Sequence, residues 1–244
     1  MDGILLIDKP KNWTSHDVVA KIRGEIKKLT GNKKIKVGHA GTLDPFATGL
    51  LILLVGSYTK RADEFLKLDK SYEFTAVLGK ESTTGDPEGE IIDISNKNPT
   101  DEEVSSALKK YIGKITQTPP QYSAIKINGK RAYKIAREGN KVEIPARQVS
   151  VYKLEKLSYD YPSLKCVCGV SSGTYIRTLA EDIGKSLGVG AYLVELRRIN
   201  IGEYNIIDAT SVENLNLPKD LLNWLFGVVF RSLPKFCKNC SKNY

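Results

Sequence analysis

The sequence predicts an α+β fold, with a central mixed or mostly antiparallel sheet flanked by helices. Segments with the two-residue alternation of strands mingle with segments of helical apolar spacing, without the regular strand-helix alternation of a parallel sheet. Hydrophobic residues make up 41% and charged residues 27% of the 244 positions, which is typical of a globular chain with a sizeable core. We expect one main domain over residues 1–208 and a short basic tail over 209–244.

The chain opens with a predicted strand and helix. Residues 3–7 are an apolar strand candidate that ends in a turn at 8–10. Thr14 or Ser15 then caps a helix whose apolar residues recur at helical spacing and which ends at Gly31. The polar face of this helix carries many lysines.

A loop follows that the sequence anchors at both ends. Residues 37–40 predict a short strand, and the continuous apolar run 50–55 predicts a buried strand. Small residues and a proline fill the loop between them, residues 41–49.

The middle of the chain predicts a strand, a helix and an excursion from the sheet. Residues 72–78 alternate between two faces, as in a half-buried strand. Thr100 opens a capping-box helix that Gly113 ends. Residues 116–147 contain a Pro-Pro break and an Asn-Gly hairpin turn at 128–129, and we interpret them as an insertion.

Three strands and a helix are predicted toward the end of the domain. Residues 149–159 and 164–171 predict successive strands, and 191–201 predict a third. The intervening helix opens at Gly173-Thr174 and ends at Gly188.

The formal net charge of +9 favours a polyanionic partner, either nucleic acid or an anionic membrane. Basic residues gather in three clusters, at 21–36, 126–137 and 231–244. Any single cluster can be an ordinary solvated face, but three together favour RNA or DNA. The sequence has no apolar run of 18 residues and no signal-peptide pattern, so we expect a cytoplasmic address and no membrane partner.

The four cysteines have spacings that resemble half-sites for zinc. They are Cys166, Cys168, Cys237 and Cys240. Because Cys166 and Cys168 lie in an apolar strand, buried thiols explain them better than a metal site does. We expect no bound metal.

Asp44 is the carboxylate to examine first, because it stands alone among small residues in the anchored loop, where a side chain can be fixed in space. The alternative is that Asp44 only stabilises the Asp-Pro turn.

Arg177 is a second candidate. If Thr174 caps the helix, Arg177 occupies the third helical position, where the helix dipole disfavours a cation, so a carboxylate partner is expected unless the side chain is solvated. Tyr72 and His39 are structural on their local pattern alone.

Six stretches of the sequence, taken in order, resemble the motifs of the TruB-type tRNA pseudouridine synthases. They are Asp8-Lys9-Pro10 with Trp13-Thr14-Ser15, residues 38–51, Lys70-Ser71-Tyr72, and residues 84–89, 119–124 and 172–179. The resemblance spans roughly residues 3–204, and several ordered motifs are far more specific than one fingerprint.

The resemblance implies the pseudouridine-synthase fold and roles for particular residues. Asp44 would be the essential aspartate, Arg177 its ion-pair partner, and Tyr72 the aromatic that packs on the target base. The remaining substrate or RNA contacts would come from His39, Leu196, Tyr175, Asp86, Lys9, Lys126, Lys130 and Arg131. The 116–147 insertion would grip RNA.

The implied reaction is the isomerisation of uridine 55 in the T loop of tRNA. It leaves the oxidation state unchanged, so we expect no cofactor, and we expect a monomer that needs no protein partner. Family members usually continue into a small RNA-binding domain, whereas here about 40 residues follow Gly202, so residues 209–244 are expected to be a truncated or vestigial form of it. Two alternatives stay open: an RNA-binding module without turnover, and an RNA-guided synthase inside a ribonucleoprotein.

Overall fold

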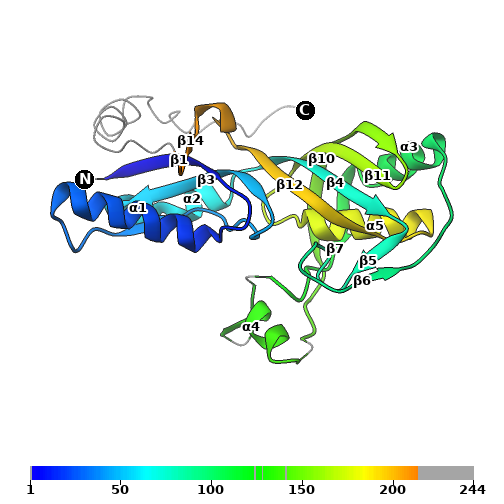
Figure 1. Cartoon of the computed structure of the whole chain (residues 1–244), viewed down its shortest axis with the longest axis horizontal. Coiled ribbons are helices and arrows are strands. Elements are labelled where there is room, and N and C mark those ends of the chain that lie inside the picture. Colours follow the sequence, from blue (N-terminus) through cyan, green and yellow to red (C-terminus); the bar gives the residue numbers. More distant parts are fainter. Residues whose placement is uncertain (1, 124, 128, 141, 214–244) are drawn as a thin grey trace, which may run out of the picture.

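The computed structural model describes residues 2–213 except 124, 128 and 141. Within these residues, one ten-stranded sheet runs through the molecule in the order β14-β1-β3-β12-β4-β11-β10-β7, with β2 beside β3 and β13 beside β12 (Figure 1). Two pairings, β1 with β14 and β3 with β12, are parallel and the others are antiparallel. This architecture confirms the predicted α+β class with a mixed, mostly antiparallel sheet.

The strands of the sheet are β1 (Gly3–Lys9), β2 (Val37–His39), β3 (Thr48–Val55), β4 (Lys70–Leu78), β7 (Gly113–Gln117), β10 (Arg147–Asp160), β11 (Ser163–Val170), β12 (Ala191–Ile201), β13 (Tyr204–Asn205) and β14 (Thr210–Ser211). Two small hairpins add β5 (Lys80–Ser82) with β6 (Ile91–Asp93), and β8 (Lys126–Ile127) with β9 (Lys130–Arg131). Strands β5, β6 and β7 were not predicted from the sequence.

The helices are α1 (Ser15–Thr30), α2 (Ala62–Leu66), α3 (Asp101–Lys109), α4 (Ala132–Arg137) and α5 (Ile176–Leu187), with short 3-10 turns η1 (Gly56–Arg61) and η2 (Ile206–Asp208). The predicted capping box forms at Thr100 with Glu103, and Thr14, one of the two predicted caps of α1, forms a second capping box with Asp17. Gly31 ends α1 in a left-handed conformation, as predicted. No helix among the described residues is long and apolar enough to cross a bilayer.

Strand β3 is buried on both faces, which explains its unbroken apolar run. Leu51 and Leu53 pack with Val18 and Ile22 of α1, whereas Leu50 belongs to a separate cluster on the other face. A two-sided strand of this kind loses the polar alternation of a solvated one.

A larger core lies where α3 and α5 pack on the β4, β10, β11 and β12 part of the sheet. Its members include Phe74 of β4 and Leu179 of α5, together with Leu43 and Phe46 from the loop between β2 and β3. The loop therefore packs into the core of the β4, β10, β11 and β12 part of the sheet, although the strands at its two ends, β2 and β3, belong to the other part.

The two halves of the sheet meet where β12 runs parallel to β3. Arg197 lies opposite Thr48 and Arg198 lies opposite Gly49. The chain between β2 and β3 ends at this junction, so the loop that carries Asp44 lies beside both halves.

The small unit with β8, β9 and α4 stands away from the sheet, below it in Figure 1. The chain leaves the sheet after Gln117 of β7 and returns at Arg147 of β10, and these two residues are paired. Within the unit, Ile127 pairs with Lys130, which fits the predicted hairpin. Residues 214–244 lie outside the described residues, and Cys237, Cys240 and most of the predicted 209–244 tail fall there. The first residues of that predicted tail are described, and Thr210–Ser211 form β14 of the main sheet.

Candidate active site

Asp44 lies in a turn that side-chain and main-chain contacts hold in place. The Asp44 carbonyl accepts a hydrogen bond from the Ala47 N–H at 3.1 Å, so the residue does take part in a turn. Ser15 Oγ accepts from the Leu43 N–H at 2.9 Å, and the Asn12 N–H donates to the Pro45 carbonyl at 2.8 Å. Because the main chain forms this turn, the Asp44 carboxylate is left to bind another group.

That group is the guanidinium of Arg177 at the start of α5. Its Nε lies 3.1 Å from Asp44 Oδ2 and its Nη2 lies 3.5 Å from Asp44 Oδ1, which is a side-on, two-point contact. The other Arg177 donors bind Asp86 Oδ2 at 3.1 Å, the Thr84 carbonyl at 2.8 Å and the Tyr122 carbonyl at 2.7 Å. The carboxylate partner that the sequence predicted for Arg177 is confirmed, and there are two of them.

The exposure of the three side chains differs in a way that suits a reactive site. The side chains of Arg177 and Asp86 are 5% and 6% exposed, whereas that of Asp44 is 32% exposed. Asp44 is therefore the one charged group of this trio that an incoming molecule can touch.

Burial raises the pKa of the Asp44 carboxyl above its ordinary value, and Arg177 is the main influence that lowers this pKa again. Asp86 adds to the rise because it is a second negative charge, while Lys9 and Arg198 oppose it. Burial in this site therefore disfavours the ionised carboxylate, and the surrounding cations favour it.

Tyr72 of β4 closes one side of the site. Its side chain is 9% exposed and belongs to the same buried cluster as Leu43, Phe46 and Leu196. Burial raises the pKa of its phenol, so the hydroxyl keeps its proton at neutral pH. Tyr72 is a core residue, as its local pattern indicated, and the negative charge of Asp44 adds to the rise in the pKa of its phenol.

Comparison with known proteins decides the family. The N-terminal domain model of the TruB family of pseudouridylate synthases matches residues 27–176, more than half of the chain. The C-terminal domain model of tRNA pseudouridylate synthase B matches residues 177–221. The chain belongs to the TruB family.

Curated relatives in the TruB family cover most of the chain. A protein of Aquifex aeolicus named tRNA pseudouridine synthase B is 40% identical over 239 residues, which are 96% of this chain and 81% of the relative. A protein of Parabacteroides distasonis with the same name is 45% identical over 87% of this chain and 91% of the relative.

Solved structures share the fold of this TruB-family chain. A chain of a Cbf5-Nop10-Gar1 complex superposes with a TM-score of 0.66 at 28% identity, over 92% of this chain and 56% of that one. An H/ACA RNP bound to a substrate RNA containing 2'-deoxyuridine gives a TM-score of 0.64 at 26% identity, over 91% and 54% of the two chains. This chain therefore spans about half of each solved chain.

The start of α5 differs in detail from the sequence prediction. Tyr175, rather than Thr174, is the N-cap of α5, so Arg177 occupies the second helical position and not the third. The side chain of Thr174 instead donates to the Ser171 carbonyl at 2.9 Å. Gln117 of β7 holds the Tyr175 main chain from both sides, accepting from its N–H at 2.8 Å and donating to its carbonyl at 3.0 Å.

Two residues expected to contact substrate or RNA are placed behind the site instead. Lys9 is 0% exposed, and its Nζ binds the carbonyls of Trp13 at 2.6 Å and Pro45 at 3.2 Å. Asp86 is 4% exposed and binds Arg177. We correct both assignments: Lys9 supports the Asp44 turn and Asp86 anchors Arg177, because neither side chain has surface to offer to RNA.

The RNA-contact roles that the resemblance implies for His39 and Tyr175 stay predictions. Burial lowers the pKa of His39, so its imidazole is neutral at pH 7, and the cations Arg198 and Arg131 act on it in the same direction. The guanidinium of Arg147 lies 5.3 Å from the centre of the Tyr175 ring, a cation-π contact that the sequence did not reveal.

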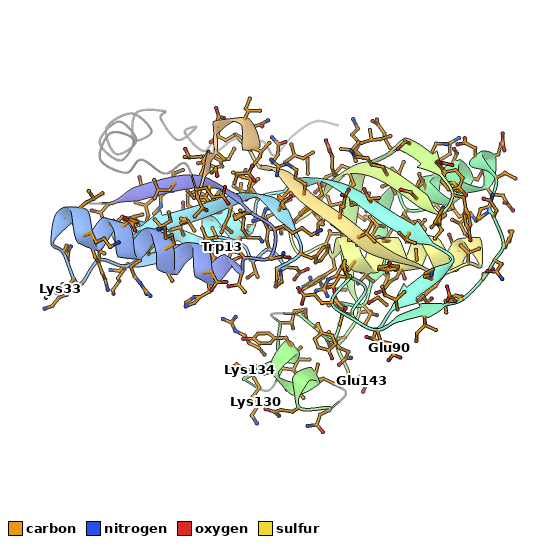
Figure 2. The ribbon with its side chains drawn as sticks, viewed as in Figure 1. Trp13, Lys33, Glu90, Lys130, Lys134 and Glu143 are labelled. Carbon is orange, nitrogen blue, oxygen red and sulfur yellow. The ribbon has the colours of Figure 1, made fainter. Side chains whose placement is uncertain are left out.

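Three of the predicted RNA contacts, Lys126, Lys130 and Arg131, belong to the small unit. Lys130 and Arg131 on β9 are exposed, and Lys126 pairs with Arg131 across the β8-β9 hairpin. Figure 2 shows Lys130 and Lys134 on this unit, away from the sheet, with Lys33 at the far end of α1.

Cys166 and Cys168 are buried, free thiols on β11. Burial raises the pKa of each to about 12, which disfavours the thiolate that zinc requires. Among the described residues no cluster of His, Cys, Asp and Glu has the arrangement of a metal site.

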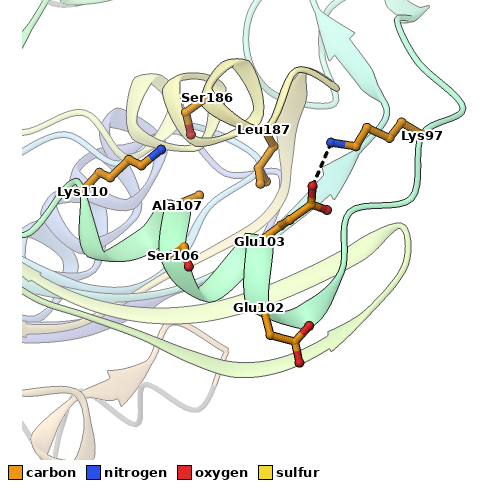
Figure 3. Close-up of a pocket in the computed structure, with 8 residues that line it drawn as sticks. All are labelled: Lys97, Glu102, Glu103, Ser106, Ala107, Lys110, Ser186 and Leu187. Carbon is orange, nitrogen blue, oxygen red and sulfur yellow. Dashed lines mark hydrogen bonds and ion pairs between the residues drawn. The ribbon is translucent and has the colours of Figure 1, made fainter.

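A second cleft lies between α3 and α5, away from Asp44. Figure 3 shows its lining, in which Lys97 pairs with Glu103 at 3.0 Å beside Ala107 and Leu187. Its lining contains none of the candidate site residues.

Proposed function

We propose that this chain converts uridine 55 in the T loop of tRNA to pseudouridine, with Asp44 as the nucleophile. The observation that carries the proposal is a partly exposed carboxylate, fixed by a two-point contact to a guanidinium whose remaining donors are all bound. Such a group is aligned before substrate arrives and is kept ionised by its partner. The relatives named tRNA pseudouridine synthase B support the choice of substrate.

The reaction breaks the bond between ribose C1′ and uracil N1 and forms a bond from C1′ to uracil C5. In this proposal the Asp44 carboxylate attacks ribose C1′ and displaces uracil N1, and the detached uracil turns while the site holds it. Uracil C5 then bonds to C1′ as the bond between C1′ and the Asp44 carboxylate breaks, which frees the carboxylate. The hydrogen on C5 then leaves as a proton, and N1 gains one, so atoms and charge balance without a redox step. Tyr72 and Leu196 confine the base so that it turns and recombines before it escapes.

A uridine inside a folded loop must leave its stack to reach Asp44, which costs a few kcal/mol. The proposed grip on tRNA comes from the lysine-rich face of α1 and from Lys130 and Arg131 of the small unit. Neutral His39 fits the space that the flipped nucleotide leaves, because an uncharged ring can stack among bases. Contacts of this kind depend strongly on salt.

The experiment is incubation of the purified chain with a bare tRNA transcript, followed by mapping of pseudouridine at single-nucleotide resolution. We expect product at position 55 and none in a matched transcript that carries cytidine there. A chain that binds both transcripts but forms no product would be an RNA-binding module. Product that appears only after a guide RNA is added would identify an RNA-guided enzyme.

The same purified sample tests the remaining predictions about partners. We expect a monomer that needs no protein partner, and no metal in elemental analysis. The alternative is a requirement for partner proteins, since one solved relative is part of a Cbf5-Nop10-Gar1 complex. The cytoplasmic address also stays a prediction, checked by fractionation of the source cells.

A further inference from the structure

Arg198 of β12 is a buried cation at the site to which neither the sequence pattern nor the reaction above gives a role. It is 2% exposed, and among the described residues no carboxylate pairs with it. Its guanidinium donates instead to the carbonyls of Leu50 at 2.7 Å, Gly41 at 3.1 Å and Thr42 at 3.5 Å. A buried arginine without a counter-ion is costly, so its retention calls for a physical reason.

The contacts of Arg198 join the two ends of the loop that carries Asp44. Its side chain binds the carbonyl of Gly41, where the loop begins. Its main chain lies against Gly49, where the loop ends: a Cβ added to Gly49 would lie 2.3 Å from the Arg198 carbonyl oxygen. On its other side Arg198 pairs with Tyr72 of β4. One residue thus touches both ends of the Asp44 loop and the strand that carries Tyr72.

The charge of Arg198 also reaches the buried titratable groups around the site. Burial is the main cause of the pKa shift of each of these groups, and Arg198 lowers the pKa of all of them: Lys9, His39, Asp44, Lys70 and Tyr72. Because no carboxylate among the described residues neutralises it, this charge acts on Asp44 in addition to that of Arg177.

We propose that Arg198 is a positioning residue for the isomerisation, which clamps the 41–49 loop against β4 so that Asp44 and Tyr72 face the same nucleotide. The expected effects on rate rest on the proposed function, whereas the contact of Arg198 with the loop does not depend on it.

The principal test is Arg198→Lys, which keeps the charge but cannot bridge three carbonyls. We expect the single-turnover rate of pseudouridine formation to fall about 100-fold, the loss that misplacement of a reacting group by about 1 Å produces. The Kd for tRNA should stay within about threefold, because Arg198 has no surface for RNA.

The matched control is Arg197→Lys on the same strand. The side chain of Arg197 is 41% exposed and pairs with Asp8 at 2.7 Å. Its rate should stay within about twofold of the unaltered chain.

The pH dependence separates clamping from mere loss of stability. The charged groups that act on Asp44 are Arg177 of α5, Asp86 of the loop between β5 and β6, Lys9 of β1 and Arg198 of β12. Arg198→Met removes one of the cations that favour the ionised carboxylate, so the acid limb of the rate profile should move to higher pH. In Arg198→Lys the limb should stay in place while the plateau falls. Weakened folding alone would leave the limb unmoved in both variants.

Amide hydrogen exchange gives a readout that needs no activity. Residues 41–49 should exchange at least about tenfold faster in Arg198→Lys than in Arg197→Lys, because only the first variant loses contacts to the loop. An Arg198→Lys chain with the exchange and rate of the control would overturn the proposal, and so would a loss of rate matched by an equal loss of tRNA affinity. If Arg198→Met does not fold, as judged by circular dichroism, Arg198→Lys decides alone. An unaltered chain that makes no pseudouridine would refute the proposed function, while the exchange comparison would still test the clamp.

Discussion

The guanidinium of Arg177 divides its donors between two carboxylates of very different exposure. Asp86 is enclosed and also accepts from the Glu88 N–H at 3.0 Å and from Thr84 Oγ1 at 2.6 Å, so it is fully occupied by the protein. Among the residues that the structure describes, Asp44 has only Arg177 as a charged partner within contact distance, and about a third of its side chain is exposed. The arrangement fixes the cation from behind and leaves the anion in front available to react.

The pH dependence of the proposed reaction follows from this arrangement. Asp44 must be ionised to attack, and its pKa is raised above 3.8 by burial. The single-turnover rate should therefore fall as the pH drops through this raised value. Arg177→Gln removes the main influence that lowers the pKa, so its acid limb should lie at higher pH and its plateau should fall by about 100-fold or more. A rate profile in which the limb of Arg177→Gln coincides with that of the unaltered chain would contradict this explanation.

Local electrostatics predicted part of the site and could not predict the rest. The position of Arg177 near a helix start indicated a carboxylate partner, and the anchored loop drew attention to Asp44. Nothing local indicated Arg198, because its three carbonyl partners are about 150 residues away in sequence. Lys9 was assigned to RNA because no local pattern indicates its burial, which depends on a contact with Pro45, a residue distant in sequence.

Among secondary-structure elements, the junction of β3 and β12 determines where the site lies. Gly49 has a φ of 103°, and a side chain there would overlap the main chain of Arg198. The close approach of the two strands therefore requires glycine at this position.

Gly49→Ala should lower the free energy of unfolding by more than about 2 kcal/mol, because strain from the positive φ adds to the overlap with Arg198. Gly113→Ala is the matched control, since Gly113 has a φ of 106° but no atom within 4 Å of the position that a Cβ would take. Denaturant unfolding of both variants checks the prediction. Equal losses of unfolding free energy in the two variants would show that the overlap with Arg198 does not destabilise the chain.

The elements themselves were easier to predict than their order in the sheet. The capping boxes at Thr14 and Thr100 and the glycine at 31 are local signals, and the helices begin and end close to them. The parallel pairing of β3 with β12 joins residues 149 positions apart, Arg197 with Thr48, and no local pattern encodes it. Strand β7 was missed because Gly113 was interpreted only as the end of a helix.

For the whole molecule, the proposed RNA contacts include exposed basic residues of the small unit, Lys130 and Arg131. The small unit carries exposed basic residues on one side of the sheet, below it in Figure 1, whereas α3 lies at the upper edge of the same half. The basic residues that give the chain its net charge of +9 thus lie both near Asp44 and far from it.

Replacement of Lys130 and Arg131 together by alanine should weaken tRNA binding about tenfold and reduce the salt dependence of log Kd by about two, one for each lost phosphate contact. The plateau rate at saturating tRNA should not change. The matched control removes Lys109 and Lys110 at the end of α3, two exposed charges of which Lys110 lines the cleft in Figure 3. Filter binding across a salt series measures both variants, and equal losses would show that only net charge matters.

The most direct test of the proposed chemistry measures release of tritium from C5 of uridine in tRNA by Asp44→Asn under single-turnover conditions. Asparagine keeps the shape of the side chain and removes the nucleophile, so we expect tRNA to bind within about threefold of normal and tritium release to fall at least about 1,000-fold. Release at the unaltered rate by a correctly folded Asp44→Asn chain would contradict the central claim that this carboxylate performs the chemistry.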